Sequence, residues 1–385
     1  MSFFNKTSKS KVVAVIDITS SSVGGALIEI NKNRPINILT ALIKKPVNFL
    51  FDVNFDASLR CTIDSLRFVT KELRNFYSGR IDQVLCVFSS PWFISQTKMV
   101  SVIKEKSFEI KKDFFSKLIE EEEKKFSDNK KTNSQFIEHV ILKTELNGYY
   151  TKSPVGKIAR SVKSHIYLSA GVKKAIESAE KEIIKVFGPV SLKFATSPLV
   201  TFKVLNDIIN NKEGFLIINI EGETTEINII RHNTLKQSAS FPRGSNLLFR
   251  KMALNLNTFL RETPSILRTY ARGHRTMESS DKIALAIKDS IKEWRDYFEK
   301  SLAAMSQESL LPQNIFLAGD DLIYKFFSPC VEKSDFSEFA ILREPFAARK
   351  INPGWMMRYF DSTNFSRYNK DVMFMIESIY ADKFN

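Results

Sequence analysis

The sequence has few residues of the kinds that bind metals or form disulfides. Its cysteines lie far apart without metal-ligand spacing, at Cys61, Cys86 and Cys330. An odd number of cysteines cannot pair completely, so we expect reduced, partly buried thiols. The histidines are equally scattered, at His139, His165, His232 and His274. The sequence therefore predicts neither a zinc site nor a histidine-based catalytic triad.

Long apolar runs are also missing. No stretch approaches the roughly 18 uninterrupted apolar residues that a membrane-spanning helix needs. The first segment, MSFFNKTSKSKVV, is polar and lacks the apolar core of a secretory signal. We therefore expect a cytoplasmic protein, and we expect any membrane contact to be peripheral, at the inner face of the cell membrane.

Negative charge is in short supply. The formal net charge is +14, which attracts an anionic partner such as a membrane surface, a nucleic acid or an acidic protein. The lysines are spread over the chain, and no zinc finger, helix-turn-helix or aromatic-basic RNA motif is present. We therefore expect no nucleic-acid partner and favour a protein partner, with an anionic membrane surface as a second attraction.

Two segments of similar design stand far apart in the chain. Residues 11–30, KVVAVIDITSSSVGGALIEI, indicate two β-branched strands around the small-residue turn Thr19 to Ser22. Residues 215–230, FLIINIEGETTEINII, repeat this design, and the strands before the two turns end at Asp17 and Asn219. Such a repeat predicts an internal duplication and two α/β lobes that face each other. The chain length of 385 residues agrees, because single cores stop growing at roughly 250 to 300 residues.

Other segments predict an insert and an additional strand-turn-helix unit. Strands at FIEHVILKTEL and SVKSHIYLSAG, followed by the helix VKKAIESAEKEIIKVFG, indicate a small α+β insert. Residues 246–308 have the periodicity of helices. Residues 314–329, NIFLAGDDLIYKFFSP, indicate a strand, a turn at Gly319 and Asp320, and a helix, which is a common place for ligands in α/β proteins.

In this order, the elements resemble those of the actin-like ATPase superfamily, and most closely the FtsA family of bacterial cell-division proteins. The hairpins are similar to that superfamily's two phosphate motifs, and NIFLAGDD is similar to its adenosine motif. The turn Pro154, Val155 and Gly156 is similar to a Pro-hydrophobic-Gly turn in the FtsA insert. The PilM family of type IV pilus assembly shares the hairpins and the adenosine turn, and it stays open as an alternative.

The resemblance implies a two-lobed actin-like (ribonuclease H-like) α/β fold with a small α+β insert subdomain. It divides the chain into the N-terminal part of the first lobe at 1–88, the FtsA-like insert at 89–188 and the rest of the first lobe at 189–212. The second-lobe core then takes 213–245, its helical subdomain 246–312, and the C-terminal part of that core 313–385.

The resemblance also implies ATP and magnesium between the lobes. Backbone amides of the two turns would hold the phosphates, and carboxylates would hold magnesium through water. On this alignment Asp17 stands on the magnesium side. The cofactor-binding positions would be Asp17, Thr19, Ser20, Ser21, Ser22, Gly222, Glu223, Thr224, Thr225, Gly319 and Asp320.

Several of these positions depart from the pattern Asp-x-Gly-x-Gly-Thr of the second phosphate motif. Asn219 replaces the aspartate, and Glu221 and Glu223 flank the glycine. An amide cannot act as a base, and each carboxylate repels a triphosphate by roughly 1 kcal/mol at 4 Å even in water. These changes favour a decayed or weakly binding site. A working ATPase that uses Asp17 with Glu221 or Glu226 remains the alternative.

The C-terminal segment DVMFMIESIYADKFN allows two interpretations. Its apolar positions fall on one helical face, which suits either a membrane-surface helix or the last core helix. We favour the core helix, because the segment stands where the superfamily has one. Taken together, the sequence predicts an FtsA-like division scaffold that recruits partners through its insert and self-associates. The alternative is a PilM-like factor that binds a peptide in a groove of the insert.

Overall fold

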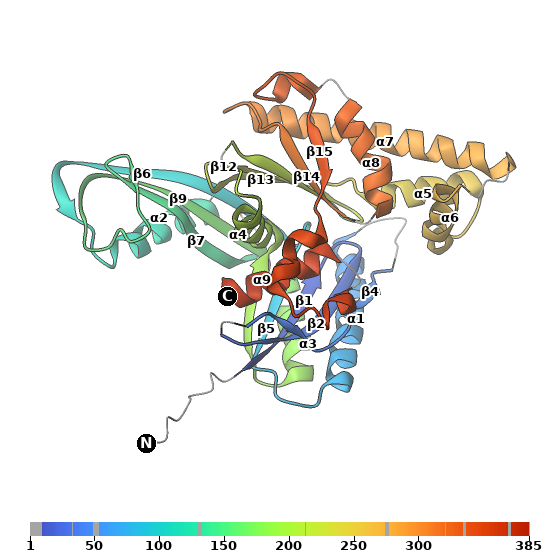
Figure 1. The fold of residues 1–385 in the computed structure, drawn as a ribbon, viewed down its shortest axis with the longest axis horizontal. Helices are drawn as coiled ribbons and strands as arrows, with labels where there is room; N and C mark the ends of the chain where they lie inside the picture. The colour runs from blue at the N-terminus through green and yellow to red at the C-terminus, as the bar shows by residue number, and fades with distance from the viewer. Residues whose placement is uncertain are drawn as a thin grey trace.

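A computed structural model describes residues 10–32, 34–48, 54–128, 133–211, 213–273, 277–319, 321–333, 336–368 and 371–384. In this part of the chain the strands form three sheets (Figure 1). Two of them build the lobes, and the third, with one helix on its face, projects to the left in the view. Cys86 is buried, Cys61 and Cys330 are half-buried, and the three form no disulfide.

The first sheet has the strand order β10-β5-β1-β2-β3, with β4 also paired to β2. Its strands are β1 (Lys11–Ile18), β2 (Ser22–Ile30), β3 (Asn37–Ile38), β4 (Ile43–Pro46), β5 (Gln83–Phe88) and β10 (Ser191–Thr196). β1 and β2 form the antiparallel hairpin, whereas β5 runs parallel to β1. β1 is apolar along nearly its whole length because helices cover both faces of this sheet.

Four helices cover the first sheet. They are α1 (Phe55–Phe76), α3 (Lys173–Phe187), α4 (Ser197–Ile209) and α9 (Val372–Lys383). α1 begins after Asn54, whose side chain accepts a hydrogen bond from the Ala57 amide at 2.8 Å. α1 packs against α3 on one face, and α9 packs against α4 and β1 on the other.

The second sheet repeats this arrangement, with the order β13-β12-β11-β14-β15. Its strands are β11 (Phe215–Ile220), β12 (Thr225–Arg231), β13 (Thr234–Phe241), β14 (Asn314–Ala318) and β15 (Ala347–Lys350). β11 and β12 form the second hairpin, and β14 runs parallel to β11 as β5 does to β1. The predicted duplication is therefore confirmed, since both sheets have the same strand order.

Helices and short 3₁₀ turns complete the second lobe. They are α5 (Ser245–Leu256), α6 (Thr263–Ala271), α7 (Met277–Ser306), α8 (Asp321–Lys333), η1 (Leu260–Glu262), η2 (Phe336–Phe339), η3 (Pro353–Tyr359) and η4 (Phe365–Tyr368). Trp294 and Phe298 of α7 pack on the sheet with Phe327 of α8. α5, α6 and the first half of α7 form a separate apolar cluster around Met252 and Leu267.

The insert is a four-stranded antiparallel sheet with the order β6-β9-β7-β8. Its elements are β6 (Phe93–Glu109), α2 (Phe114–Asp128), β7 (Ser134–Leu146), β8 (Tyr149–Tyr150) and β9 (Ile158–Val172). Leu118 and Phe126 of α2 pack on Ile166 and Leu168 of β9. The predicted domain limits stay predictions, although α3 packs on α1 of the first lobe and α9 packs on β1.

The C-terminal helix α9 lies in the core. Of the positions predicted to form one apolar face, Val372, Ile376, Ile379 and Tyr380 are buried and Met373 is half-buried. Phe374, Met375, Glu377 and Ser378, on the other side, are buried as well. Interpreting this segment as a core helix was therefore correct, and its buried surface is wider than one stripe. In the part of the chain that the structure describes, none of the helices combines the length and the apolar character needed to cross a bilayer.

Candidate functional site

The turns of the two hairpins lie against each other. The Glu223 amide donates a hydrogen bond to Ser20 Oγ at 3.0 Å, and Ser21 Oγ donates to Glu221 Oε2 at 3.5 Å. A Cβ added at Gly222 would lie 2.5 Å from the Cβ of Ser21, so only glycine allows this approach. The structure thus brings together two turns that are about two hundred residues apart.

The first turn satisfies its own amides. Thr19 is buried, and its Oγ1 accepts hydrogen bonds from the amides of Ser21 at 3.1 Å and Ser22 at 3.0 Å. The Thr19 amide in turn donates to the Ser22 carbonyl at 3.0 Å. These are three of the four amides in the turn that the resemblance would assign to a phosphate, and each of the three already has an acceptor within the turn.

The second turn is tied to helix α5. The amides of Ser245 and Asn246 donate to the carbonyls of Glu221 and Gly222, both at 2.8 Å. A Cβ at Gly244 would lie 2.3 Å from the Glu221 carbonyl oxygen, so this contact needs glycine. The first turn of α5 therefore uses its unpaired amides on the hairpin.

The two carboxylates of the second turn have partners within the protein. Glu223 accepts from both Nη atoms of Arg250, at 2.5 and 2.8 Å, and from Asn246 Nδ2 at 2.7 Å. Glu221 accepts from Asn219 Nδ2 at 2.9 Å. A bidentate pair with arginine is among the strongest of such interactions. Glutamate at position 223 thus has a structural partner on α5.

Asp17 lies in a buried group of carboxyls beneath the turns. Burial is the main reason that the pKa values of Asp17 and Glu377 lie well above their ordinary range, and nearby carboxylates raise both further. Among the described residues, Asp17 Oδ1 and both carboxyl oxygens of Glu377 have no hydrogen-bond partner. The nearby ammonium of Lys44 is paired with Asp371 at 3.1 Å. This environment favours neutral, protonated carboxyls over the anions that a cation would need.

Glu226 joins the two lobes. It is buried in β12 and accepts hydrogen bonds from the Ser90 amide at 2.6 Å and from Ser197 Oγ at 2.5 Å. Thr224 adds a third contact, because its Oγ1 donates to the Ser90 carbonyl at 3.1 Å. Burial raises the pKa of Glu226 to about 7. Both carboxyl oxygens are thus engaged in holding the first lobe against the second.

Two predicted positions, Thr225 and Gly319, lie away from the contact between the turns. The Thr225 side chain donates to the Arg243 carbonyl at 2.7 Å and accepts from Trp294 Nε1 at 2.9 Å, so it supports α7. Gly319 has a φ of +146°, and the hollow that it lines with described neighbours such as Ile323 has no space for a water molecule. Asp320 lies outside the described residues.

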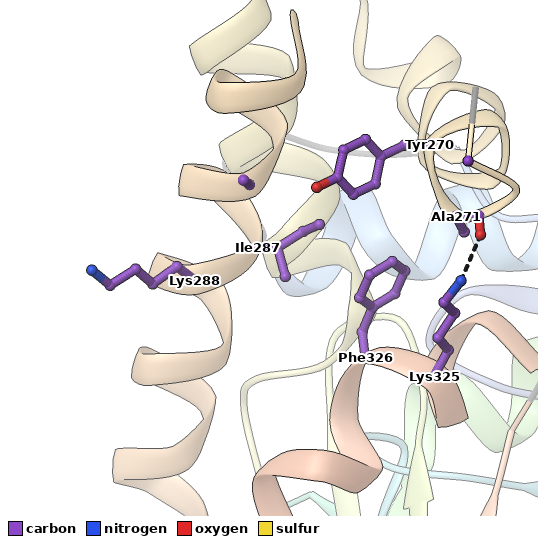
Figure 2. Close-up of a pocket in the computed structure, with 8 residues that line it drawn as sticks. Tyr270, Ala271, Ile287, Lys288, Lys325 and Phe326 are labelled. Carbon is purple, nitrogen blue, oxygen red and sulfur yellow. Dashed lines mark hydrogen bonds between the residues drawn. The ribbon is translucent and has the colours of Figure 1, made fainter. Parts of the chain in front are cut away.

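The described residues also line larger hollows, including one of about 180 Å³ beside Ser90 and Glu226. Another, of about 370 Å³, lies among α6, α7 and α8, where Tyr270, Ile287 and Phe326 point toward one another (Figure 2). Lys325 borders it and donates to the Ala271 carbonyl at 2.5 Å. A third, of about 310 Å³, is a groove in the insert lined by Phe115, Ile141, Leu142, Lys143, Thr144, Tyr150, Thr151, Lys152 and Pro154. Neither of the last two is lined by a hairpin turn.

Comparison with known proteins finds a solved structure with a similar architecture. A solved structure of the PilM-PilN type IV pilus biogenesis complex matches with a TM-score of 0.65, at 16% sequence identity, over 96% of this chain and 98% of that chain. The protein has an actin-like ATPase fold. The fold predicted from the sequence is therefore confirmed.

Sequence comparison adds a second relative. The cell division protein FtsA of Neisseria meningitidis serogroup B is 21% identical over 252 residues, which cover 64% of this chain and 58% of that protein. The match therefore spans little more than half of the relative. A Bacteroides thetaiotaomicron protein with an actin-like ATPase fold and unknown function has a TM-score of 0.44, with 14% identity over 92% of this chain and 95% of its own. No family model matches the chain.

The sequence interpretation missed several residues of the site. Arg250, Asn246, Ser90 and Ser197 were not predicted, and each contributes a hydrogen bond to Glu223 or Glu226. A usable signal for Arg250 was the pair of glutamates in the second turn, followed by the basic segment FPRGSNLLFRK. In the described residues no three His, Cys, Asp or Glu side chains are arranged to hold a metal ion, and the assignment of Asp17 to magnesium stays a prediction.

Proposed function

We propose that this protein is an actin-fold scaffold for a membrane-associated bacterial assembly, and that it does not hydrolyse ATP. The observation that carries this proposal is the direct contact between the two turns, with the Glu223 amide bonded to Ser20 Oγ at 3.0 Å. In a working site the space between such turns holds phosphates. Here hydroxyl and carboxylate groups of the chain itself occupy the space between the turns.

The residues present do not fit magnesium-ATP. The amides of Ser21, Ser22 and Glu223 already have acceptors. Glu221 places a carboxyl group at the turn, and its charged form would repel phosphate. Burial raises the pKa of this carboxyl, whereas Lys44 and the Asn219 side-chain amide lower it and so favour the charged form.

Calorimetric titration with ATP and magnesium tests this proposal. We expect no saturable heat at protein concentrations that detect micromolar binding, because the turns would have to separate before phosphate could enter. The matched variant is Asp17→Ala. Tight binding to the natural sequence that this variant abolishes would overturn the proposal and support the ATPase alternative.

Two assemblies are candidates for the scaffold. The division role is supported by the sequence match with FtsA, and it would include recruitment of division proteins through the insert together with self-association. The pilus role is supported by the structural match with the PilM-PilN complex, which covers nearly the whole of both chains. In the pilus role, the insert groove beside Phe115 and Leu142 would bind an apolar peptide segment, with acidic residues facing Lys143 and Lys152.

A fluorescent fusion expressed at its natural level, together with a deletion strain, separates the two roles. A division scaffold would form a band at mid-cell, and its loss would leave elongated, undivided cells. A pilus factor would be absent from the division site, and its loss would remove surface pili without changing cell length. A diffuse fusion with neither phenotype would contradict both roles.

A further inference from the structure

The outer end of the insert carries exposed apolar side chains. This surface, which we call the arm tip, consists of residues 103–112 and 147–161, at the ends of β6, β7, β8 and β9 that lie farthest from the lobes (Figure 1). Its apolar side chains are more exposed than is usual for their kind: Tyr149 is 80% exposed, Ile103 73%, Ile158 69% and Val155 46%. An exposed apolar group of this kind often marks an interaction surface.

The arm tip is also strongly basic. Its basic residues are Lys104, Lys106, Lys111, Lys112, Lys152, Lys157 and Arg160, and its acidic residues are Glu105 and Glu109. All of these side chains are exposed. In the part of the chain that the structure describes, none of these basic side chains takes part in an ion pair. The tip therefore presents positive charge that its own carboxylates do not balance.

The two segments of the tip are held together as one surface. The Ile110 amide donates to the Lys157 carbonyl at 2.9 Å, and the Gly156 amide donates to the Ile110 carbonyl at 2.8 Å. Ile110 is buried with Phe115, Leu146 and Ala159 beneath the tip. The turn at Gly156 needs a φ of +81°, which glycine adopts readily. These hydrogen bonds and the buried cluster hold the backbone in place while the side chains of Val155 and Ile158 remain exposed.

We propose that the arm tip docks on an anionic phospholipid bilayer, with its isoleucine, valine and tyrosine side chains entering the headgroup region and its lysines contacting lipid phosphates. Three observations favour a bilayer over a protein partner. The apolar side chains stand at the end of a projecting arm, tyrosine suits the membrane interface, and positive charge surrounds them. Helix α9 cannot serve as an anchor because it is buried in the core.

Vesicle co-sedimentation tests this inference on the full chain. We expect binding to vesicles of phosphatidylcholine mixed with phosphatidylglycerol, weaker binding at high salt, and little binding to phosphatidylcholine alone. The double variant Lys106→Gln, Lys112→Gln should weaken binding by about 25-fold, at about 5-fold for each lysine near the surface. The double variant Ile103→Ser, Ile158→Ser should weaken it by about 10-fold through lost apolar contact.

Matched controls change the same residue types elsewhere on the surface. Lys71→Gln with Lys181→Gln removes two exposed lysines from α1 and α3, and Leu254→Ser with Leu285→Ser removes two exposed leucines from α5 and α7. Both controls should bind vesicles like the natural sequence, and all variants should keep its thermal unfolding midpoint. Equal loss in tip and control variants, or equal binding to neutral vesicles, would overturn the inference. No vesicle binding, with tip-dependent binding to an acidic protein or a nucleic acid, would also overturn it.

The arm tip includes Lys152, which also lines the insert groove, but the residues changed in the test, Lys106, Lys112, Ile103 and Ile158, do not line that groove. The vesicle result therefore does not depend on whether the scaffold serves division or pilus assembly. If ATP binding were found, the vesicle result would be unaffected, because the arm tip shares no residue with the hairpin turns.

Discussion

The two hairpins occupy equivalent places in two sheets of the same strand order, yet their turns are held differently. The turn at Thr19 to Ser22 satisfies its amides with its own threonine hydroxyl. The turn at Glu221 to Thr224 depends on α5, which supplies two amides, an asparagine and an arginine. The same hairpin backbone can therefore be stabilised by hydrogen bonds within its own turn or by hydrogen bonds from a neighbouring helix. Four predictions test this difference.

The largest expected effect comes from Gly244→Ala, which should separate the second turn from α5. The new Cβ would lie 2.3 Å from the Glu221 carbonyl oxygen and 2.5 Å from that of Gly222, and backbone atoms cannot move aside cheaply. We expect a loss of about 3 to 4 kcal/mol in the free energy of unfolding, measured by chemical denaturation. The control Gly354→Ala meets only the flexible Asn352 side chain, at 3.1 Å, and should cost much less. Similar losses in both variants would contradict the prediction.

The second prediction concerns the ion pair between the turn and α5. Glu223→Gly restores a glycine of the phosphate motif but leaves Arg250 without its carboxylate, in a pair whose side chains are only 22% and 18% exposed. We expect destabilisation of about 2 kcal/mol, because a half-buried guanidinium loses a bidentate partner. The control is Asp64→Ala, which breaks an exposed ion pair with Arg67 and should cost below about 1 kcal/mol. Alanine is used here because glycine at this position would itself destabilise helix α1. A stabilised Glu223→Gly variant that binds ATP would reverse our interpretation of this turn.

The third prediction concerns pH and the contact between the lobes. Burial raises the pKa of Glu226 to about 7 from an ordinary value of 4.5, so the folded state holds this proton more tightly than the unfolded state. The stability that this proton contributes is complete below about pH 4.5 and is lost as the pH rises through about 7.

Glu226→Gln should therefore remove part of the fall in stability between these pH values, by up to about 3 kcal/mol. Denaturation curves at several pH values measure this slope. Glu177→Gln, at an exposed position of α3, is the matched control and should leave the slope unchanged. An unchanged slope in Glu226→Gln would mean that this carboxyl titrates normally in the folded protein.

The smallest expected effect belongs to the contact between the turns themselves. Ser20→Ala removes the acceptor of the Glu223 amide, a hydrogen bond of 3.0 Å, while the first turn keeps its own bonds through Thr19. We expect a loss of about 1 kcal/mol, together with faster hydrogen exchange at the Glu223 amide. Ser153→Ala, at an exposed site in the insert, should change neither quantity. Unchanged exchange at Glu223 would show that the turns do not depend on this bond.

Much of the architecture was predictable because its signals are local. Apolar, β-branched residues on either side of Thr19 to Ser22 and of Glu221 to Thr224 marked both hairpins, and the strand order of both sheets agrees. The site was harder to predict. Two glutamates in a turn signalled repulsion of phosphate, but Arg250, the partner of Glu223, lies on a helix, and sequence spacing does not say which way that helix points.

Glu377 illustrates the same limit in the core. The apolar pattern of the last segment predicted one buried face, and Glu377 stands off that face. In the fold it is fully buried near Asp17, because α9 is covered by α4, β1 and η3. A helical periodicity describes one helix and its preferred face, whereas burial depends on how many neighbours surround that helix.

By itself, the sequence determined the two hairpins, the insert and the excess of positive charge, because each follows from residues close together in the chain or from composition. Only the tertiary structure decided that the two turns touch, that Glu223 pairs with Arg250 of α5, that Glu226 of β12 bridges the lobes, and that unbalanced lysines gather at the end of the insert. These features join residues distant in sequence, and their energies depend on separation and burial in space, which spacing along the chain does not specify.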